Sequence, residues 1–118
     1  MANDKKKYDL EERTEVFGEN VIDILKTIKV NDINRPLISQ FVRSSTSIGA
    51  NYGEADSAVS KKDFRNKIGT CRKESKETKH WLRMMSRANP EKIEDFRKLW
   101  KEAHEFVLIF SKIFNSSK

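Results

Sequence analysis

The sequence predicts an all-α protein, an up-and-down antiparallel four-helix bundle in a single domain over residues 1–118. Charged and apolar residues each make up 36% of the chain, which has only four glycines and two prolines, a composition typical of helical bundles. Apolar residues recur at three- and four-residue intervals in four segments, which indicates four amphipathic helices. A chain of this length buries enough surface to fold around one core.

The first two helices are predicted from the apolar pattern and from capping residues. Residues 9–29 carry an apolar stripe at helical spacing, with acids concentrated at the start, as a helix dipole favours. Residues 1–8 show no periodicity and are predicted to form a mobile tail. Asn34 or Asp32 is expected to cap the second helix, which ends at a break over residues 57–60.

The third and fourth helices have clear start signals. Ser60 with Asp63 resembles a capping box that opens a third helix extending to Ala88. Asn89 is predicted to cap the fourth helix, with Pro90 as its first residue. The core face of the third helix is expected to hold Phe64, Ile68, Cys71, Ser75, Thr78, Leu82 and Met85. The fourth is expected to bury Ile93, Phe96, Leu99, Trp100, Ala103, Phe106, Val107, Phe110, Ile113 and Phe114.

The end of the fourth helix carries more apolar residues than one core needs. Leu108 and Ile109 project away from the main stripe, so residues 106–110 are apolar nearly all round. An exposed patch at this position favours self-association, and both residues are predicted to lie in an oligomer interface. The polar residues 115–118 are expected to fray.

A polar stripe follows the second helix beside its core face. Its members are Gln40, Arg43, Ser47, Asn51 and Glu54. Arg43 and Glu54 are eleven positions apart, about 16 Å along a helix, so they cannot pair with each other. Glu74 and Glu77 on the third helix are the predicted partners of Arg43, in a buried or interfacial network that fixes the register between helices or subunits.

The order of residues in this stretch resembles a known family signature. Gln40, Arg43-Ser44, Ser47-Ile48, Ala50-Asn51 and Glu54 match the pattern Q-x-x-R-S-x-x-S-I-x-A-N-x-x-E of four-helix-bundle proteins encoded in 23S ribosomal RNA intervening sequences. The similarity continues through Asp63-Phe64, through the residues from Lys73 to Thr78, and at Trp81-Leu82. The family usually continues Asn-Ile-Ala-Glu-Gly, whereas this chain has Asn51-Tyr52-Gly53-Glu54-Ala55, so the exit from the second helix is expected to differ.

The resemblance also carries expectations about assembly. The same superfamily includes the accessory variability protein of diversity-generating retroelements. Family members form homopentamers, so the resemblance implies a homo-oligomeric ring, most simply a pentamer. The retroelement branch further implies a possible protein partner, such as a reverse transcriptase.

Positive charge is concentrated in the third helix. Residues 61–87 contain ten Lys and Arg and three acids, a balance of 10 − 3 = +7, so the rest of the chain nets −1 within the total of +6. Six basic residues align beside the core face, namely Arg65, Arg72, Lys76, Lys79, Arg83 and Arg87. This stripe spans about 33 Å and predicts binding to RNA or DNA backbone. The alternative is a solvated face whose aliphatic stems cover the core edge, on a scaffold for a protein partner.

The sequence predicts neither an enzyme nor a cofactor or metal site. His80 and His104 are 24 residues apart and lack further ligands at metal-binding spacings. Cys71 is placed on the core face and His80 on the outer face, which argues against a catalytic pair. No apolar run is long enough to cross a membrane, and the single cysteine suits a reducing compartment, so a cytoplasmic protein is expected.

Overall fold

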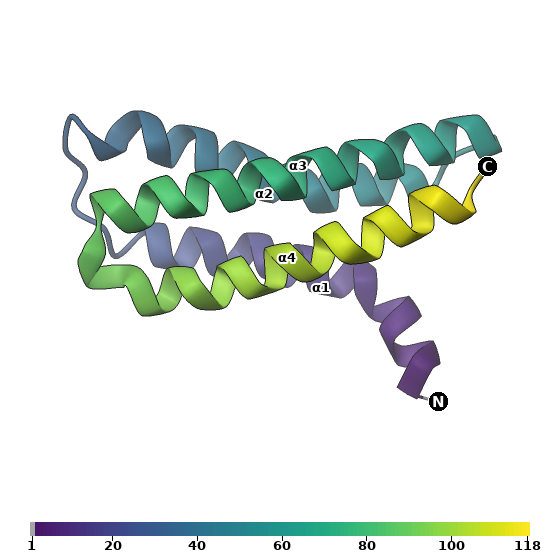
Figure 1. The fold of residues 1–118 in the computed structure, drawn as a ribbon, viewed down its shortest axis with the longest axis horizontal. Helices are drawn as coiled ribbons and strands as arrows, with labels where there is room; N and C mark the ends of the chain where they lie inside the picture. The colour runs from purple at the N-terminus through teal and green to yellow at the C-terminus, as the bar shows by residue number, and fades with distance from the viewer. Residues whose placement is uncertain (1) are drawn as a thin grey trace.

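Four helices form an up-and-down antiparallel bundle, which confirms the predicted fold class (Figure 1). The computed structural model describes the backbone of residues 2–118 and the side chains of residues 10–118. The helices are α1 (Ala2–Leu25), α2 (Asn34–Asp56), α3 (Lys61–Ala88) and α4 (Ile93–Ser116), with a 3₁₀ turn η1 (Pro90–Lys92) before α4. α3 packs extensively against both α2 and α4, whereas α1 contacts α2 more than α4.

The limits of α1 differ from the predicted range 9–29. The helix begins at Ala2, although the side chains of the predicted tail, residues 1–8, lie outside the described part of the chain. At the other end α1 stops at Leu25, because Thr27 and Ile28 donate their backbone N–H groups to carbonyls three residues earlier. This tighter turn ends the regular helix sooner than the apolar pattern predicts.

The predicted cap of α2 is wrong in its residue. Asn31, and neither Asn34 nor Asp32, accepts the N–H groups of Ile33 and Asn34, at 2.9 and 2.8 Å. Asp32 instead pairs with Arg35 at the surface. Asn34 is buried, and its Nδ2 donates to the carbonyl of Lys29 at 3.0 Å and to Oδ1 of Asn89 at 3.1 Å. A buried amide therefore joins the α1–α2 loop to the end of α3.

The predicted cap of α4 is also wrong, because the side chain of Asn89 is bonded elsewhere. The Asn89 side chain accepts from Asn34 and donates to the Met85 carbonyl, so it caps no amide of the fourth helix. Pro90–Lys92 forms a 3₁₀ turn, and the α-helix begins only at Ile93. The Ser60 cap of α3 is confirmed, since its Oγ accepts the Asp63 N–H at 3.0 Å. The break after α2 is confirmed as well, because that helix ends at Asp56.

The core contains several buried phenylalanine rings that pack against one another. Phe17 meets Phe106 edge-on with ring centroids 5.4 Å apart, and Phe41 meets Phe96 in the same way at 6.3 Å. On the predicted face of α3, every residue except Phe64 is buried, and Phe64 is partly buried. Two predictions for α4 are wrong, because Ile93 and Trp100 are 37% and 40% exposed. Trp100 is covered on α3 by the Lys79 side chain, which leaves much of the indole exposed.

Polar groups inside the bundle form hydrogen bonds both within one helix and between helices. The hydroxyl of Thr78 on α3 donates to the hydroxyl of Ser44 on α2 at 3.0 Å, and Ser45 and Ser75 donate to carbonyls of their own helices. No buried side-chain nitrogen or oxygen in the described part of the chain lacks a partner. Small hydroxyl residues thus let α2 and α3 approach closely without stranding polar groups. None of the described helices is long and apolar enough to cross a membrane.

Candidate nucleic-acid interface

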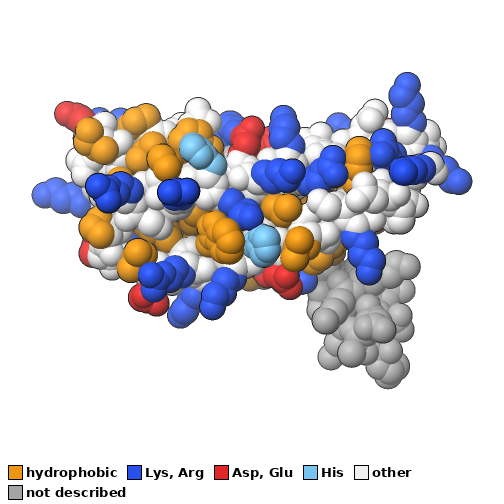
Figure 2. Space-filling view, in the orientation of Figure 1, with side chains coloured by type: hydrophobic (Ala, Val, Ile, Leu, Met, Phe, Trp, Pro, Cys, Tyr) orange, Lys and Arg blue, Asp and Glu red, His pale blue; other side chains and the backbone are white. Residues whose placement is uncertain are grey.

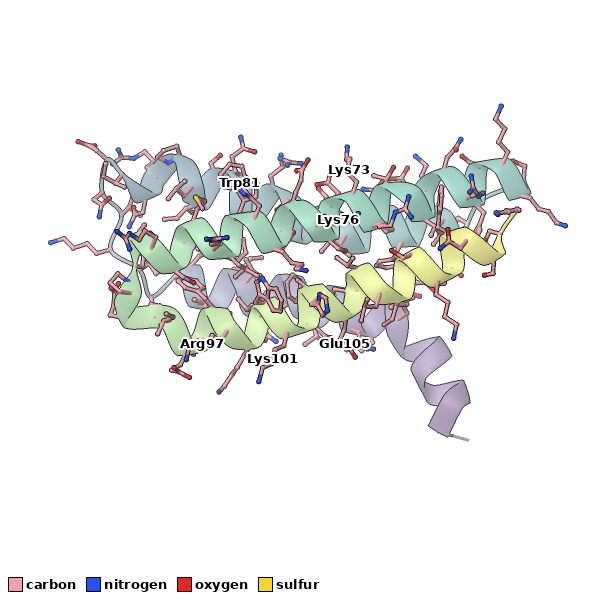
Figure 3. The ribbon with its side chains drawn as sticks, in the orientation of Figure 1. Lys73, Lys76, Trp81, Arg97, Lys101 and Glu105 are labelled. Carbon is pink, nitrogen blue, oxygen red and sulfur yellow. The ribbon has the colours of Figure 1, made fainter. Side chains whose placement is uncertain are left out.

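The candidate interface is the face formed by α3 and α4. Figure 2 shows Lys and Arg side chains along both helices on this face, with hydrophobic and His side chains between them. Lys76 lies on this face of α3 in Figure 3, whereas Lys73 and Trp81 lie along the other edge of that helix. Arg97 and Lys101 lie along the outer edge of α4. The surface is therefore a strip of cations that encloses aromatic groups.

Two of the six predicted cations hold the end of α4. The guanidinium groups of Arg65 and Arg72 lie 3.7 and 4.2 Å from the centroid of the Phe114 ring, and Arg65 Nε donates to the Phe114 carbonyl at 3.3 Å. Gly69 leaves room for the ring, since a Cβ there would come within 3.1 Å of Phe114 Cε2. We call this contact the Phe114 clamp. Both arginines are only partly exposed, so they stabilise the α3–α4 contact.

A third predicted cation, Lys79, contacts aromatic rings on α4. Its Nζ lies 2.9 Å from Nδ1 of His104 and 4.5 Å from the centre of the Trp100 ring. The two rings are stacked, with planes 9° apart and centroids 5.1 Å apart. Because a lysine ammonium can only donate, His104 Nδ1 accepts this hydrogen bond. We call Lys79, Trp100 and His104 the aromatic cluster.

The remaining three predicted cations are free to meet a ligand. Lys76, Arg83 and Arg87 are exposed and form no ion pair within 4.0 Å among the residues that the structure describes. They extend over eleven positions, about 16 Å along the helix. The open part of the stripe is thus about half as long as the sequence predicts, because the cations nearer the start of α3 are used against Phe114.

On the opposite flank of α3, two acids bind Arg43 of α2. Its guanidinium donates to both oxygens of Glu74 at 3.3 Å and to Glu77 at 2.6 Å, and its Nε donates to Gln40 at 3.3 Å. The pKa of Arg43 is raised, chiefly by the hydrogen bond to Glu77. The Arg43 side chain is 46% exposed and that of Glu74 only 8%. The network thus lies at the edge of the α2–α3 contact, and Glu74 is its buried member.

The other members of the α2 stripe are not joined into this network. Ser47 donates to the Arg43 carbonyl and Asn51 to the Ser47 carbonyl, both within α2. Glu54 pairs with Lys67 of α3 at 3.1 Å, a partner that the sequence analysis missed. Lys67 precedes Glu74 by seven residues, two helical turns, so the same flank of α3 meets both ends of the stripe.

Leu108 and Ile109, the two predicted interface residues, differ in exposure. Leu108 is 51% exposed. Ile109 is partly buried and packs against the core, so it does not project freely into the solvent. Only Leu108 therefore presents a largely free apolar side chain at this turn.

Cys71 is buried, and the potential metal ligands of the described region are not clustered. Burial raises the pKa of the Cys71 thiol to about 12, and its Sγ lies 3.6 Å from the Ile48 carbonyl oxygen. Cys71 is thus a neutral core group at ordinary pH. Within residues 10–118, no group of three or more His, Cys, Asp or Glu side chains is placed to hold a metal ion.

The fold and the site define a small helical bundle with a cationic third helix joined to the second by an Arg–Glu network. The chain belongs to the 23S rRNA-intervening sequence protein family, whose sequence model matches residues 6–112. It is also similar to a crystal structure from Bacteroides thetaiotaomicron, a protein of unknown function from the S23 ribosomal protein family. The two share 28% sequence identity with a TM-score of 0.76, over 88% of this chain and 96% of the other. No curated protein matches the sequence.

These comparisons confirm the family resemblance carried by the α2 motif. The link to the accessory variability protein of retroelements stays a prediction. Among the motif residues, Arg43, Ser44 and Glu54 all contact side chains of α3. The signature therefore marks a helix–helix contact, whereas the exposed cations lie on the other side of α3.

Proposed function

We propose that the protein binds nucleic acid without catalysing a reaction, and that the exposed cations of α3 contact backbone phosphates. The observation that carries this proposal is the one-sided charge of α3. Its acids Glu74 and Glu77 are turned to α2 and engaged by Arg43, so they do not neutralise the cations that face the other way. Clustered, unpaired cations are what a phosphate backbone requires.

Structured RNA is the first ligand to test. The family to which the chain belongs is described by its connection with 23S rRNA intervening sequences. Phosphate contacts fix a protein on a nucleic acid but do not read its sequence. The α3 face is therefore expected to bind RNA and DNA of many sequences, with an affinity set by charge and shape.

The test compares two variants that lose the same charge. Lys76, Arg83 and Arg87 are replaced together with Gln, which hardly changes helix propensity. In the control, Lys26, Lys29 and Arg35 are replaced, three exposed residues outside α3. Binding to a structured RNA and to duplex DNA is measured at several salt concentrations. The α3 variant should bind both ligands more weakly. The slope of log affinity against log salt concentration should also become shallower, by about 0.7 to 0.9 for each lost phosphate contact.

Two outcomes would contradict the proposal. One is an α3 variant that binds as tightly as the parent with the same salt slope. The other is an equal loss in both variants, which would mean that only net charge matters. The first result favours the second candidate function, a scaffold for a protein partner such as a reverse transcriptase. The exposed apolar side chains of Leu108, Ile22 and Val16 support that second candidate.

Self-association is compatible with both candidate functions, nucleic-acid binding and a scaffold for a protein partner. We propose a homo-oligomer, a pentamer by family resemblance, in which Leu108 lies in the contact between subunits. An oligomer would repeat the cations of α3 and so multiply the phosphate contacts of each particle.

A further inference from the structure

We propose that Trp100 is a stacking surface for an unpaired nucleobase, so that the preferred ligand of the α3–α4 face is single-stranded nucleic acid. This inference rests on the proposed function and specifies its ligand class. It concerns the aromatic cluster, which phosphate binding alone does not use. Single-stranded binding sites in general combine a cationic track with an aromatic ring on which a base stacks.

The contacts of the cluster leave part of Trp100 exposed to solvent. The rings of Trp100 and His104 are nearly parallel, at 9°, and a hydrogen bond to Nδ1 lies near the plane of the imidazole. Lys79 Nζ, which makes that bond at 2.9 Å, therefore sits on the same side of the indole as His104. Trp100 nevertheless remains 40% exposed, and this exposed part of the side chain is what a base would cover.

The cluster also holds the indole in place. Trp100 and His104 are four residues apart on α4, and the lysine that contacts both comes from α3. A side chain fixed on one face by stacking and by a cation loses little further freedom when a base covers the other face. The aromatic ring is thus both exposed and ordered, the combination that a stacking site needs.

Exposed cations lie on both sides of this ring along α3. Lys76 precedes Lys79 by three residues and Arg83 follows it by four, about 4.5 and 6 Å along the helix axis. Both are exposed and unpaired among the described residues. Phosphates on either side of a stacked nucleotide can therefore meet a cation while its base meets Trp100. In a duplex the base faces are covered by neighbouring bases, so only the phosphate contacts are available.

The experiment uses the full chain in a Trp81→Phe background, where Trp100 is the only tryptophan. Its fluorescence is followed during titration with short single-stranded RNA, the matching single-stranded DNA, and an RNA duplex, at constant salt. We expect the single strands to quench the emission and the duplex to leave it nearly unchanged. Trp100→Leu in the same background should weaken single-strand binding by about 5- to 150-fold, with less than a twofold effect on the duplex.

Controls separate stacking from folding and from charge. Trp100→Phe keeps an aromatic face and should retain most of the single-strand affinity, while circular dichroism checks that each variant is folded. The stacking site is disproved if Trp100→Leu binds single strands as tightly as its parent while the Gln variant of Lys76, Arg83 and Arg87 loses binding. That result would leave the proposed phosphate contacts of α3 standing. Failure of RNA and DNA alike to bind the parent protein would overturn both proposals.

Discussion

Glu74 is the only acidic or basic side chain that is buried among residues 10–118. Its carboxylate pairs with Arg43, whose side chain is half exposed. Burial therefore removes solvent mainly from Glu74, and Glu74 depends on Arg43 to compensate its charge. Removing a buried acid's partner leaves an uncompensated charge, whereas removing a member of an exposed pair changes little. Arg43, which pairs with a buried acid, is therefore expected to matter more for stability than Arg97, which pairs with an exposed acid.

Replacing Arg43 with Ala is expected to destabilise the protein by about 2 kcal/mol, less than a fully buried pair because Arg43 is half exposed. Arg97→Ala is the matched control, since Arg97 pairs with Glu94 at the surface with both side chains more than 60% exposed, and it should cost less than 1 kcal/mol. Urea unfolding of the two variants measures the difference. Equal midpoints would show that Glu74 does not depend on Arg43.

Cys71 predicts how stability depends on pH above neutrality. Burial raises its pKa from an ordinary value of 9.0 to about 12, so the folded protein holds this proton more tightly than the unfolded chain. The resulting stability is complete below pH 9 and is lost as the pH rises toward 12. The unfolding free energy of the wild type minus that of Cys71→Ala should fall by about 1 kcal/mol per pH unit between pH 9.5 and 11. A constant difference would contradict the prediction.

At the scale of the helix, α3 joins the other elements with three distinct contacts. One flank meets α2 through the acids that bind Arg43. The core face packs inside the bundle, and the side toward α4 carries the Phe114 clamp and the aromatic cluster. The remaining cations are left to the solvent. One helix with a single apolar stripe thus separates cations that hold the bundle together from cations that face the solvent.

Replacing Phe114 with Ala tests the clamp. The change removes a partly buried ring and two cation–π contacts, so a loss of about 2 to 3 kcal/mol in unfolding free energy is expected. The freed Arg65 and Arg72 should then be able to bind phosphates, which would steepen the salt dependence of RNA binding. Ile93→Ala is a suitable control, because it shortens an apolar residue that is 37% exposed at the other end of α4. An unchanged stability would show that the clamp contributes little.

The sequence predicted the elements better than their ends. The start of α3 was predictable because Ser60 lies three residues before Asp63 with no competing partner. The start of α4 was not, because the side chain that should cap it is taken by Asn34, which lies 55 residues away in the sequence. Periodicity identified the cations of α3, yet it could not show that Phe114 would cover two of them. Contacts between distant segments determine which side chains of a predicted face stay free.

At the scale of the whole molecule, the surface is divided between a cationic face and scattered apolar side chains. The exposed large apolar residues are spread over α1, α4 and the loops. Leu108 is 51% exposed and lies in the turn of α4 that the sequence predicts to be apolar nearly all round. It is therefore the position where a second subunit is expected to dock.

Leu108→Lys should reduce the size of the particle while leaving the helix content unchanged, since a charge in a subunit contact opposes docking more than folding. Light scattering at tens of micromolar, with circular dichroism in the same buffer, measures both. Val59→Lys is the control, because Val59 is 97% exposed in the α2–α3 loop. A monomeric wild-type protein, or an equal effect of both variants, would rule out Leu108 as an interface residue.

The position of Cys71 has a consequence for measuring motion. It is the only cysteine of the chain and lies between α2 and α3, fully buried and facing the Ile48 carbonyl. An alkylating reagent can therefore reach the sulfur only while these two helices are apart. The rate of labelling in native buffer then reports how often the helices separate, without any introduced probe. A nucleic acid that contacts only the α3–α4 face should leave this rate nearly unchanged, whereas a ligand that enters between α2 and α3 should alter it.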